Sequence, residues 1–382
     1  MPELLPFRGL RYSEGPDVSN LVAPPYDVID EKERRRLEER SEHNAVRVEL
    51  PQDDGATDRY TNARCLIDTW QQTGVLARDD EPTLTAYRMT YGDETGGERH
   101  TLGVLGALAI ADGALLPHEH TTPKAKDDRL NLLRTCRTNV SPIWGLAPAP
   151  GLSALLAPTG PPDAVAEDED GVRHEAWTIT DPDRIAKIAA AAGAQPILVA
   201  DGHHRYEVAR AYREERRAAN GDQPGDYDAV FAYVVELDDA QLTVGAIHRL
   251  VTGLPPDFDI VAALDPYFAA EAVTTPDALA VVTRSGAWRL TPRDPGAHDL
   301  DSSRVAEALS AFPDHTLTYQ HGQATVLGAV ASGEADAAFL LRPATVDQIA
   351  DTGRLGVRMP PKTTFFWPKP RTGIVFRPVE DE

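Results

Sequence analysis

Cysteine is almost absent from this sequence of 382 residues. Its only two cysteines, Cys65 and Cys136, do not form a CxxC spacing. A disulfide framework is therefore excluded as the basis of the fold, and the composition fits a reducing cytoplasm. Neither thiol lies in a motif with a histidine, so nucleophilic Cys–His chemistry is disfavoured.

Long apolar runs and a net positive charge are missing as well. The longest apolar run, residues 102 to 116, contains Asp112 and is too short to span a bilayer. The opening residues lack a basic stretch followed by an apolar core, so no signal peptide is expected. The formal charge of −22 repels nucleic acids and anionic membrane surfaces. We therefore expect a cytoplasmic protein with small-molecule partners, and its oligomeric state is left open.

Hydrophobic residues make up 42% of the chain, which is enough for a packed interior. A chain of this length predicts two lobes or one large α/β domain. Strand-like and helix-like segments mix without a regular βαβ rhythm, so the expected fold class is α+β, that is, mixed α/β. We expect an N-terminal α/β region over residues 1–100 and a larger region over residues 101–382, with insertions near residues 151–180 and 255–300.

Several segments have readable secondary structure. Residues 58–74 predict a helix with one apolar face, and residues 83–110 predict a hairpin around a turn-rich centre. Residues 227–237 and 242–250 predict two adjacent strands. Residues 157–173 are rich in proline, glycine and acidic side chains, so they predict a surface loop.

The stretch "ILVADGHHRYEVAR", residues 197–210, joins an apolar strand to a helix through the turn signal Asp201–Gly202. At a helix start the first backbone N–H groups lack partners, and the helix dipole presents a partial positive charge. Gly202 allows the backbone to approach a ligand closely. The junction therefore predicts a site for an anion such as phosphate.

The side chains at this junction allow more than one interpretation. His203, His204 and Arg205 add donors, and Arg205 can grip a phosphate through two nitrogens. Asp201 would help to hold Mg²⁺ or orient a histidine. In the simpler alternative, Asp201 only caps the helix and the histidines face solvent.

Zinc binding is a further alternative for these histidines. The motif "PHEH" contains His118 and His120, which could complete a ligand set. The HExxH spacing that places two histidines on one helical face is absent, so a zinc site is not favoured.

Three separate segments of the sequence resemble motifs of a known family, and they occur in the same order as in that family. They are "LPHEH" (116–120), "ILVADGHHR" (197–205) and "MPPKTTFFWP" (359–368). They are similar to motifs of the archaeal free L-serine kinases, a branch of the ParB/sulfiredoxin superfamily. The chain also resembles, over nearly its whole length, a large bacterial family of unknown function whose hallmarks include "PPYDVI" and "DGHHRYEVA".

The resemblance implies a ParB/sulfiredoxin-like core with an added N-terminal region. It also implies a kinase that phosphorylates free serine or a similar small hydroxylated metabolite, with ADP or ATP and Mg²⁺. Glu119 matches the residue that the kinase family uses as catalytic base. The candidate catalytic residues are Glu119, Asp201 and His204; the candidate nucleotide-binding residues are Gly202, His203 and Arg205; the candidate substrate-binding residues are Lys362, Thr363, Thr364 and Arg129.

Arg129 follows Glu119 closely and would add positive charge, although its segment also fits a capped amphipathic helix with Leu130 and Leu133 inward. The chain departs from sulfiredoxin, which needs a cysteine where His203 stands. Residues 1–100 have no counterpart in the archaeal kinases. Other functions therefore stay open, namely a ParB-like nucleotide-binding switch without metabolite kinase activity and a phosphatase or exchange reaction at the same site. The sequence does not identify the donor nucleotide, the acceptor or the direction of the reaction.

Overall fold

A computed structural model of the chain describes residues 1–92, 96–117, 123–276, 279–296, 298–355, 359–360 and 362–380. The chain packs as two units. Unit 1 is built from Met1–Pro117, Thr121–Leu242 and Pro368–Glu382, and unit 2 contains Thr243–Trp367. The chain therefore leaves unit 1 after residue 242 and returns to it at residue 368. The boundary expected at residue 100 falls inside strand β5 (Glu98–Ala109), which belongs to unit 1.

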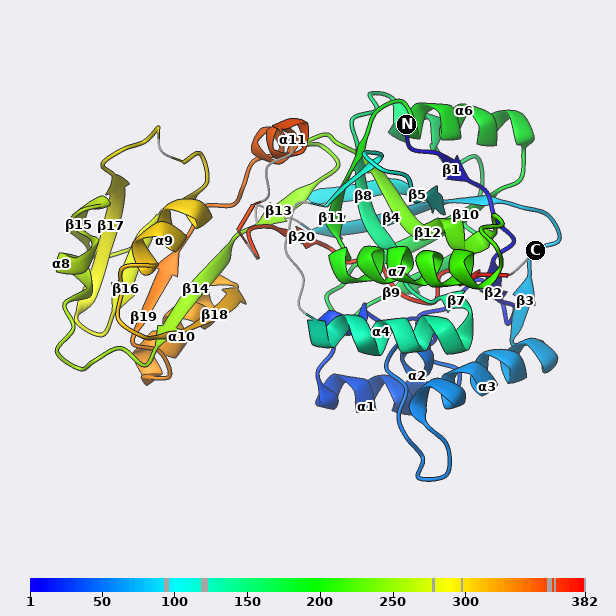
Figure 1. Cartoon of the computed structure of the whole chain (residues 1–382), viewed down its shortest axis with the longest axis horizontal. Coiled ribbons are helices and arrows are strands. Elements are labelled where there is room, and N and C mark those ends of the chain that lie inside the picture. The colour runs from blue at the N-terminus through cyan, green and yellow to red at the C-terminus, as the bar shows by residue number, and fades with distance from the viewer. Residues whose placement is uncertain are drawn as a thin grey trace. The chain divides into compact units, whose positions relative to one another are not determined.

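A mixed sheet forms the centre of unit 1 (Figure 1). The β6–β11 and β8–β12 pairs are parallel and the other pairs are antiparallel, which confirms the mixed α/β class. The strand order is β6 (Leu115–Pro117), β11 (Ile197–Asp201), β8 (Ile143–Ala147), β12 (Ala229–Glu236), β5, β4 (Leu84–Gly92), β10 (Arg173–Ile179) and β9 (Ala164–Glu167), with β1 (Leu4–Leu5) paired to β5.

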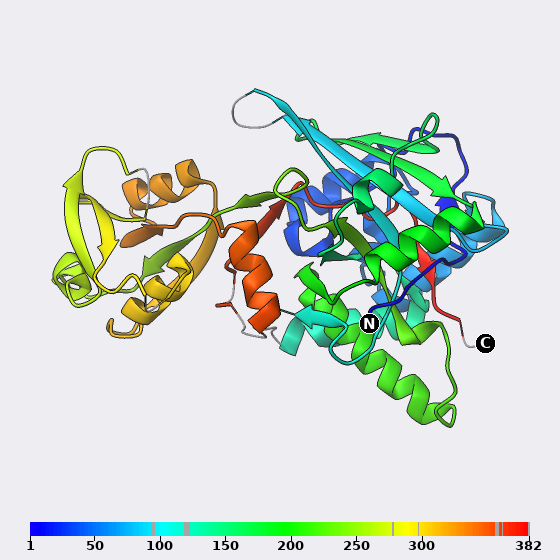
Figure 2. The ribbon, with the colours of Figure 1, turned by 90° about the horizontal axis from the view of Figure 1, so that it is seen from above.

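The predicted hairpin is confirmed as β4 and β5, which run side by side as the long cyan pair in Figure 2. Next to β5 lies β12, whose β-branched and aromatic residues are all buried. Gly103 of β5 faces this strand. A Cβ at Gly103 would lie 2.6 Å from the Tyr233 side chain, so this close approach of strands requires glycine.

Helices lie on both sides of the unit 1 sheet in Figure 1. On one side, α7 (His203–Ala219) packs against α4 (Pro123–Cys136), which in turn packs against α3 (Arg59–Gln72). The α3 helix starts at Asp58, whose carboxylate accepts hydrogen bonds from two N–H groups, and it buries Ala63, Ile67 and Trp70 as its spacing predicts. The other helices of unit 1 are α1 (Glu31–Arg40), α2 (Val46–Glu49), α5 (Leu152–Leu155), α6 (Pro182–Ala192), η1 (Tyr26–Val28) and η2 (Asp226–Asp228).

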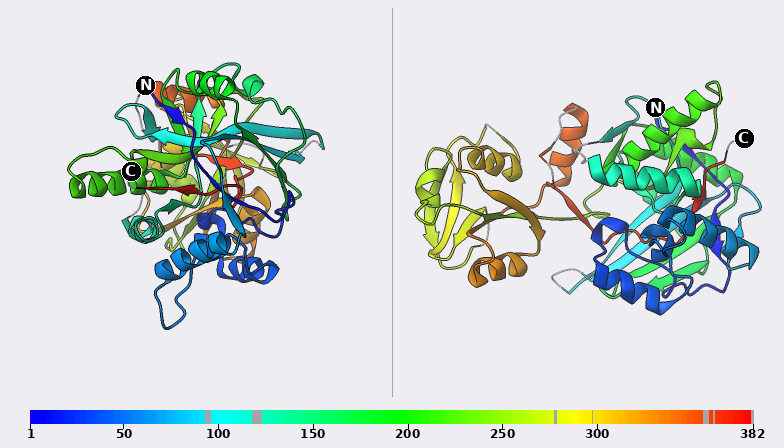
Figure 3. Two further views of the ribbon diagram at one scale, coloured as in Figure 1. Left: turned by 90° about the vertical axis from the view of Figure 1, so that its right-hand side faces the viewer. Right: turned by 60° about the horizontal axis from the view of Figure 1, so that its bottom comes forward.

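Residues 368–380, here called the C-terminal strap, return to unit 1 and run against its N-terminal segment (red in Figure 3). Ala23 and Thr372 exchange two backbone hydrogen bonds of 3.0 and 2.8 Å, and Phe376 pairs with Leu10. Two short sheets complete this region: β2 (Leu10–Tyr12) with β3 (Leu76–Arg78), and β7 (Thr138–Asn139) with β21 (Arg377–Pro378).

Unit 2 has its own sheet with helices on both faces (Figure 3). Side chains alternate between the two faces along a strand. Val281 and Phe339 therefore pack with α8 (Ile260–Leu264) and α9 (Asp301–Leu309), whereas Ala280 and Ala338 pack with α10 (Gln323–Ser332) on the other face. The strand order is β15 (Phe268–Val273), β17 (Gly286–Pro292), β16 (Ala280–Thr283), β19 (Ala337–Leu340), β14 (Ile247–Thr252) and β18 (Thr316–His321); the helices are α8 (Ile260–Leu264), α9 (Asp301–Leu309), α10 (Gln323–Ser332) and α11 (Val346–Leu355); β13 (Thr243–Gly245) pairs with β20 (Phe365–Trp367).

Two expectations from the sequence are wrong. The segments at 227–237 and 242–250 are not adjacent strands, because β12 pairs with β5 and β8 in unit 1 while β13 and β14 belong to unit 2. The predicted surface loop at 157–173 contains β9, a short strand that pairs with β10 and whose Val165 bonds to the backbone of Pro16 and Val18 on its other side. Across the described ranges, no helix is long and apolar enough to cross a membrane.

Candidate functional site

The turn between β11 and α7 is shaped by Gly202, which has a left-handed backbone with φ of 86°. A Cβ at this position would lie 3.0 Å from Arg205 Nε and 3.1 Å from the Ile143 backbone, so the turn accepts only glycine without strain. Gly202, the residue before α7, has no side chain that could cap the helix. The start of α7 carries the positive end of the helix dipole, and its role as an anion site stays a prediction.

Asp201, at the end of β11, forms two ion pairs instead of capping the helix. Its Oδ2 accepts a hydrogen bond from Arg205 Nη2 at 3.0 Å, and its Oδ1 lies 2.8 Å from Lys369 Nζ. The side chains of Asp201, Arg205 and Lys369 are 20%, 10% and 13% exposed, respectively. Burial opposes ionisation of the carboxyl, but the charges of Lys369 and Arg205 outweigh it and hold the pKa of Asp201 well below its usual value.

Lys369 belongs to the C-terminal strap and was not among the residues selected from the sequence. Its segment reads Pro368–Lys369–Pro370, so its backbone is restricted on both sides. The Pro-Lys-Pro spacing is the only local signal that could have found it. Its partner Asp201 lies far away in the chain, and only the fold brings the two together.

The Arg205 guanidinium is directed toward protein groups. Its Nη1 donates to the carbonyl oxygen of Pro142, its Nη2 donates to Asp201, and its Nε has no hydrogen-bond partner within the described part of the chain. Arg205 therefore links Asp201, at the turn, to the backbone of Pro142.

Tyr26, in η1 after Pro24–Pro25, lies between two arginines. The Cζ atoms of Arg129 and Arg205 are 4.5 and 6.0 Å from the centre of its ring. Burial raises the pKa of Tyr26 to about 12, so its hydroxyl stays protonated at neutral pH. The "PPYD" segment therefore contacts the "DGHHR" junction through the Tyr26 ring and Arg205.

Arg129 is buried, and its nitrogens are all directed toward protein groups. Nε and Nη2 donate to the Asp128 carboxylate at 2.9 and 2.6 Å, and Nη1 donates to the carbonyl oxygen of Glu49 at 2.6 Å. It therefore links α4 to the end of α2. Contact with a substrate would require Arg129 to exchange one of these partners, so its substrate-binding role stays a prediction.

Glu49 is a fully buried carboxyl beside the same cluster, and sequence reasoning missed it. Its Oε1 accepts hydrogen bonds from the Tyr26 N–H at 3.1 Å and the Ser141 hydroxyl at 3.0 Å, whereas Oε2 has no partner among the residues described. Burial raises the pKa of Glu49, and the nearby Arg129 and Arg205 only partly oppose this.

Replacing Glu49 with glutamine is expected to flatten the pH dependence of stability. A carboxyl with a raised folded-state pKa contributes its full stability below its unfolded pKa, 4.5, and loses it as the pH rises through the folded value. E49Q should therefore gain stability relative to the wild type as the pH is raised from about 5 to about 8, measured by urea unfolding.

Glu236→Gln is the matched control for this change. Glu236 is also buried, but hydrogen bonds from Ser153 and Gly151 lower its pKa against the effect of burial. E236Q should destabilise the protein by a similar amount at both pH values. Equal pH dependence of E49Q and wild type would contradict the assignment for Glu49.

The histidines of the motif lie at the first turn of α7, where His203 is buried and His204 is half-buried. Nearby, Lys126 of α4 forms an ion pair with Glu207 of α7. Glu119, the candidate base, lies outside the described residues. The roles of all three candidates stay predictions.

A site for Mg²⁺ or zinc would need several ligands among the described residues. Among them no group of three or more His, Cys, Asp or Glu side chains could hold a metal ion. Both oxygens of Asp201 already face cations, which disfavours a metal at that carboxylate. His118 and His120 lie outside the described residues. The Asp201 carboxylate therefore does not fit a resident metal ion.

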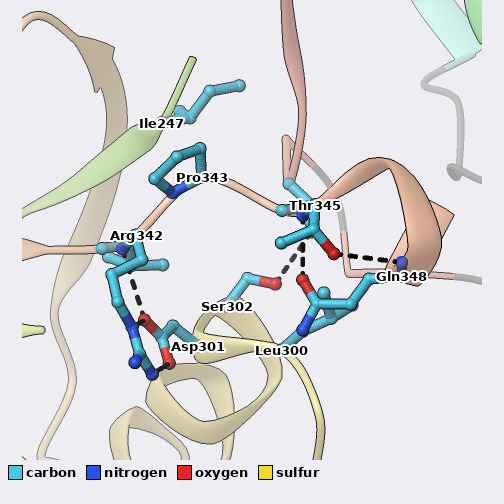
Figure 4. Close-up of a pocket in the computed structure, with 11 residues that line it drawn as sticks. Ile247, Leu300, Asp301, Ser302, Arg342, Pro343, Thr345 and Gln348 are labelled. Atoms are coloured by element: carbon cyan, nitrogen blue, oxygen red, sulfur yellow. Dashed lines mark hydrogen bonds and ion pairs between the residues drawn. The ribbon is translucent and has the colours of Figure 1, made fainter. Parts of the chain in front are cut away.

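In unit 2, Thr363 lines a cavity of about 180 Å³, shown in Figure 4. Its hydroxyl lies 3.0 Å from that of Ser302, and both side chains are buried. The Asp301 carboxylate holds Arg342 through bonds of 2.7 and 2.8 Å. Figure 4 also shows Thr345 and Gln348, which bond to each other at the start of α11.

Lys362 and Thr364, the other two candidate residues of the "PKTT" motif, differ in their exposure to solvent. Lys362 is exposed with a positive φ of 55°, and Thr364 is buried. The structure thus gathers Arg129, Asp201, Gly202 and Arg205 in unit 1, whereas the "PKTT" residues belong to unit 2 and one of them faces a cavity there.

The family model described as "Protein of unknown function (DUF1015)" matches residues 4–314. No curated protein matches the sequence. Solved structures similar to the chain include a free serine kinase in complex with AMP, with 17% identity, a TM-score of 0.37, and coverage of 69% of this chain and 86% of that one. A conserved hypothetical protein from Pyrococcus furiosus has 16% identity and a TM-score of 0.36, with coverage of 69% of this chain and 90% of that one. SbnI with C-terminal truncation from Staphylococcus aureus has 12% identity and a TM-score of 0.41, with coverage of 70% of this chain and 85% of that one.

Proposed function

The chain belongs to the DUF1015 family of proteins of unknown function, and on that premise we propose that it is a nucleotide-dependent phosphotransferase. The donor in this proposal is ADP or ATP, which enters as its Mg²⁺ complex. The acceptor is free serine or a similar small hydroxylated metabolite. The proposal combines the three motifs of the sequence with the geometry at the start of α7.

The observation that carries the proposal is the start of α7. This helix begins at a left-handed glycine, and an ion pair to Asp201 holds Lys369 close to the turn that precedes it. Backbone N–H groups and a fixed cation together favour a phosphate anion. The protein as a whole carries a formal charge of −22, so a local positive site is what an anionic nucleotide would need.

Phosphoryl transfer needs positioning and charge neutralisation more than covalent help from the protein. In our proposal the backbone from Gly202 to Arg205 holds the donor phosphates, and Lys369 neutralises part of their charge. Asp201 and Arg205 keep Lys369 and the turn in place. His204 stays a proposed catalytic residue at the first turn of the helix.

Glu119 is the proposed general base, which would take the proton from the acceptor hydroxyl. Lys362, Thr363 and Thr364 are the proposed acceptor-binding residues. The Thr363 hydroxyl donates to the Pro360 carbonyl at 2.7 Å, so in this proposal it would accept a hydrogen bond from a small polar molecule in the cavity of unit 2.

The test is to incubate the pure protein with Mg²⁺, serine and either ADP or ATP, and to look for phosphoserine by mass spectrometry. Alanine in place of serine is the control, because it lacks the hydroxyl that would accept the phosphoryl group. We expect product with at least one donor and none with alanine. A panel of other small hydroxylated metabolites extends the search.

The same experiment separates the alternative of a nucleotide-binding switch. A switch would bind nucleotide and change its assembly, seen by light scattering, without forming product from any acceptor in the panel. Absence of both product and nucleotide binding, at enzyme concentrations near those of the substrates, would refute the proposed function.

A further inference from the structure

A closed circuit of hydrogen bonds surrounds Arg371, two residues after Lys369 in the C-terminal strap. The Arg371 backbone N–H donates to the Tyr87 hydroxyl at 3.1 Å, and this hydroxyl lies 2.8 Å from His174 Nδ1. His174 Nε2 lies 3.0 Å from Asp168 Oδ2, and the same oxygen accepts a hydrogen bond from Arg371 Nη2. The circuit therefore begins at the backbone of Arg371 and ends at its guanidinium.

One arrangement of protons satisfies every member of this circuit. Tyr87 donates its hydroxyl proton to His174 Nδ1, and a neutral His174 donates its Nε2 proton to Asp168. The 3.4 Å approach of Arg371 Nε to His174 Nε2 then joins two N–H groups and is not a hydrogen bond. Burial, together with the charge of Arg371, lowers the pKa of His174, which agrees with a neutral ring.

The circuit is closed to solvent. Tyr87 and His174 are fully buried, their rings stack at 6.0 Å, and the Arg371 side chain is also buried. The second oxygen of Asp168 accepts the backbone N–H groups of Asp170 and Val172, so this carboxylate has no spare acceptor for another role. The arrangement fixes a point on the strap rather than offering a ligand site.

The backbone transmits this fixed point to Lys369. Pro370 separates Arg371 from Lys369 and Pro368 precedes it, and both prolines are buried. On the other side of Arg371, Thr372 pairs with Ala23, which directly precedes the Pro24–Pro25–Tyr26 segment. The anchor at Arg371 is thus joined through short, stiff stretches of backbone to two parts of the candidate site.

We propose that this circuit makes Arg371 a positioning residue, which holds Lys369 against Asp201 at the start of α7. The structural half of the proposal concerns only the Lys369–Asp201 pair. The functional half, that this placement serves nucleotide binding, rests on the proposed function.

The structural half is tested by labelling the full chain with trace acetic anhydride and measuring acetylation of each lysine by mass spectrometry. In the wild type, Lys369 should react about tenfold more slowly than the exposed Lys187, because attack requires it to leave its ion pair. In Arg371→Met this protection should disappear. Tyr87→Phe, which removes only the hydroxyl, should give an intermediate rate and covers the case in which Arg371→Met does not fold.

Arg377→Met is the matched control. Arg377 is a buried arginine in the same strap, but it bonds to Asn139 and to the carbonyls of Ala229 and Asp226, outside the circuit. Its loss should lower thermal stability and leave Lys369 protected. Unchanged protection of Lys369 in both Arg371→Met and Tyr87→Phe would overturn the proposal, as would equal loss of protection in Arg377→Met.

The functional half is tested by a double-mutant cycle of nucleotide affinity. Arg371→Met should weaken binding in the wild type and have no further effect in a Lys369→Met background, because it acts through Lys369. An equal effect of Arg371→Met in both backgrounds would refute this half. If the wild type binds no nucleotide, the proposed function fails, and the labelling result still decides whether Arg371 positions Lys369.

Discussion

Replacing Asp201 with asparagine is expected to lower the free energy of unfolding by about 3 kcal/mol. Asp201 is the shared partner of Arg205 and Lys369, which are only 10% and 13% exposed. The amide would leave two neighbouring cations out of water without a balancing charge. The figure lies at the low end for a buried pair because the Asp201 carboxylate itself is 20% exposed. Urea unfolding at neutral pH and constant ionic strength measures it.

Asp228→Asn is the matched control for this prediction. Asp228 also bridges two arginines of α7, and its side chain is 23% exposed, close to the value for Asp201. The side chains of its partners Arg213 and Arg217 are 31% and 27% exposed, which is more than those of Arg205 and Lys369. D228N should therefore cost about 1 kcal/mol or less. Equal losses for the two variants would mean that burial of the cations does not set the strength of the Asp201 cluster.

The Asp201 variant should also change the response to acid. The folded-state pKa of Asp201 is held well below its ordinary value, 3.8. Such a carboxylate contributes stability that is present above its unfolded pKa and is lost as the pH falls through the folded value. Between neutral pH and the ordinary value the stability deficit of D201N should stay constant, and at lower pH it should shrink.

Replacing Lys369 with methionine is expected to weaken nucleotide binding by about 10- to 150-fold, which corresponds to about 1.5–3 kcal/mol for a charge-assisted hydrogen bond. The physical reason is that the ion pair with Asp201 holds the charge of Lys369 close to the turn that precedes α7. Isothermal titration with ADP and ATP measures the effect. The variant should be more stable than D201N, because Asp201 keeps Arg205 as its partner.

Lys126→Met is the control for the loss of one positive charge. Lys126 also lies beside α7, where it pairs with Glu207, but its side chain is 35% exposed. Solvent and salt screen such a charge, so we expect only about a twofold change in affinity. Affinities lowered equally by K126M and K369M would show that general charge, and not the placement of Lys369, governs binding.

The junction of β11 and α7 could be predicted from local sequence alone. An apolar run followed by Asp201–Gly202 marks the end of a strand, and the apolar spacing after it marks a helix that begins at His203. The need for glycine at the turn also follows from local chemistry, and its left-handed φ confirms it. These features depend on a few neighbouring residues, which a single sequence displays directly.

The partners of the charged residues could not be predicted in this way. Lys369 stands between two prolines, and Glu49 ends a short helix that resembles an ordinary surface segment. Both become buried only through contacts with distant parts of the chain. The misplacement of residues 242–250 has the same origin, since no local signal marks the point where the chain passes from one unit to the next.

The return of the chain to unit 1 at residue 368 has a consequence for biosynthesis. A ribosome makes the protein from its N-terminus, so the sheet of unit 1 emerges long before the strap that carries Lys369 and Arg371. Until all of unit 2 has been translated, Tyr87, His174 and Asp168 lack the arginine that completes their circuit. Nascent unit 1 must therefore hold the Asp168 carboxylate without its arginine partner while unit 2 is being made.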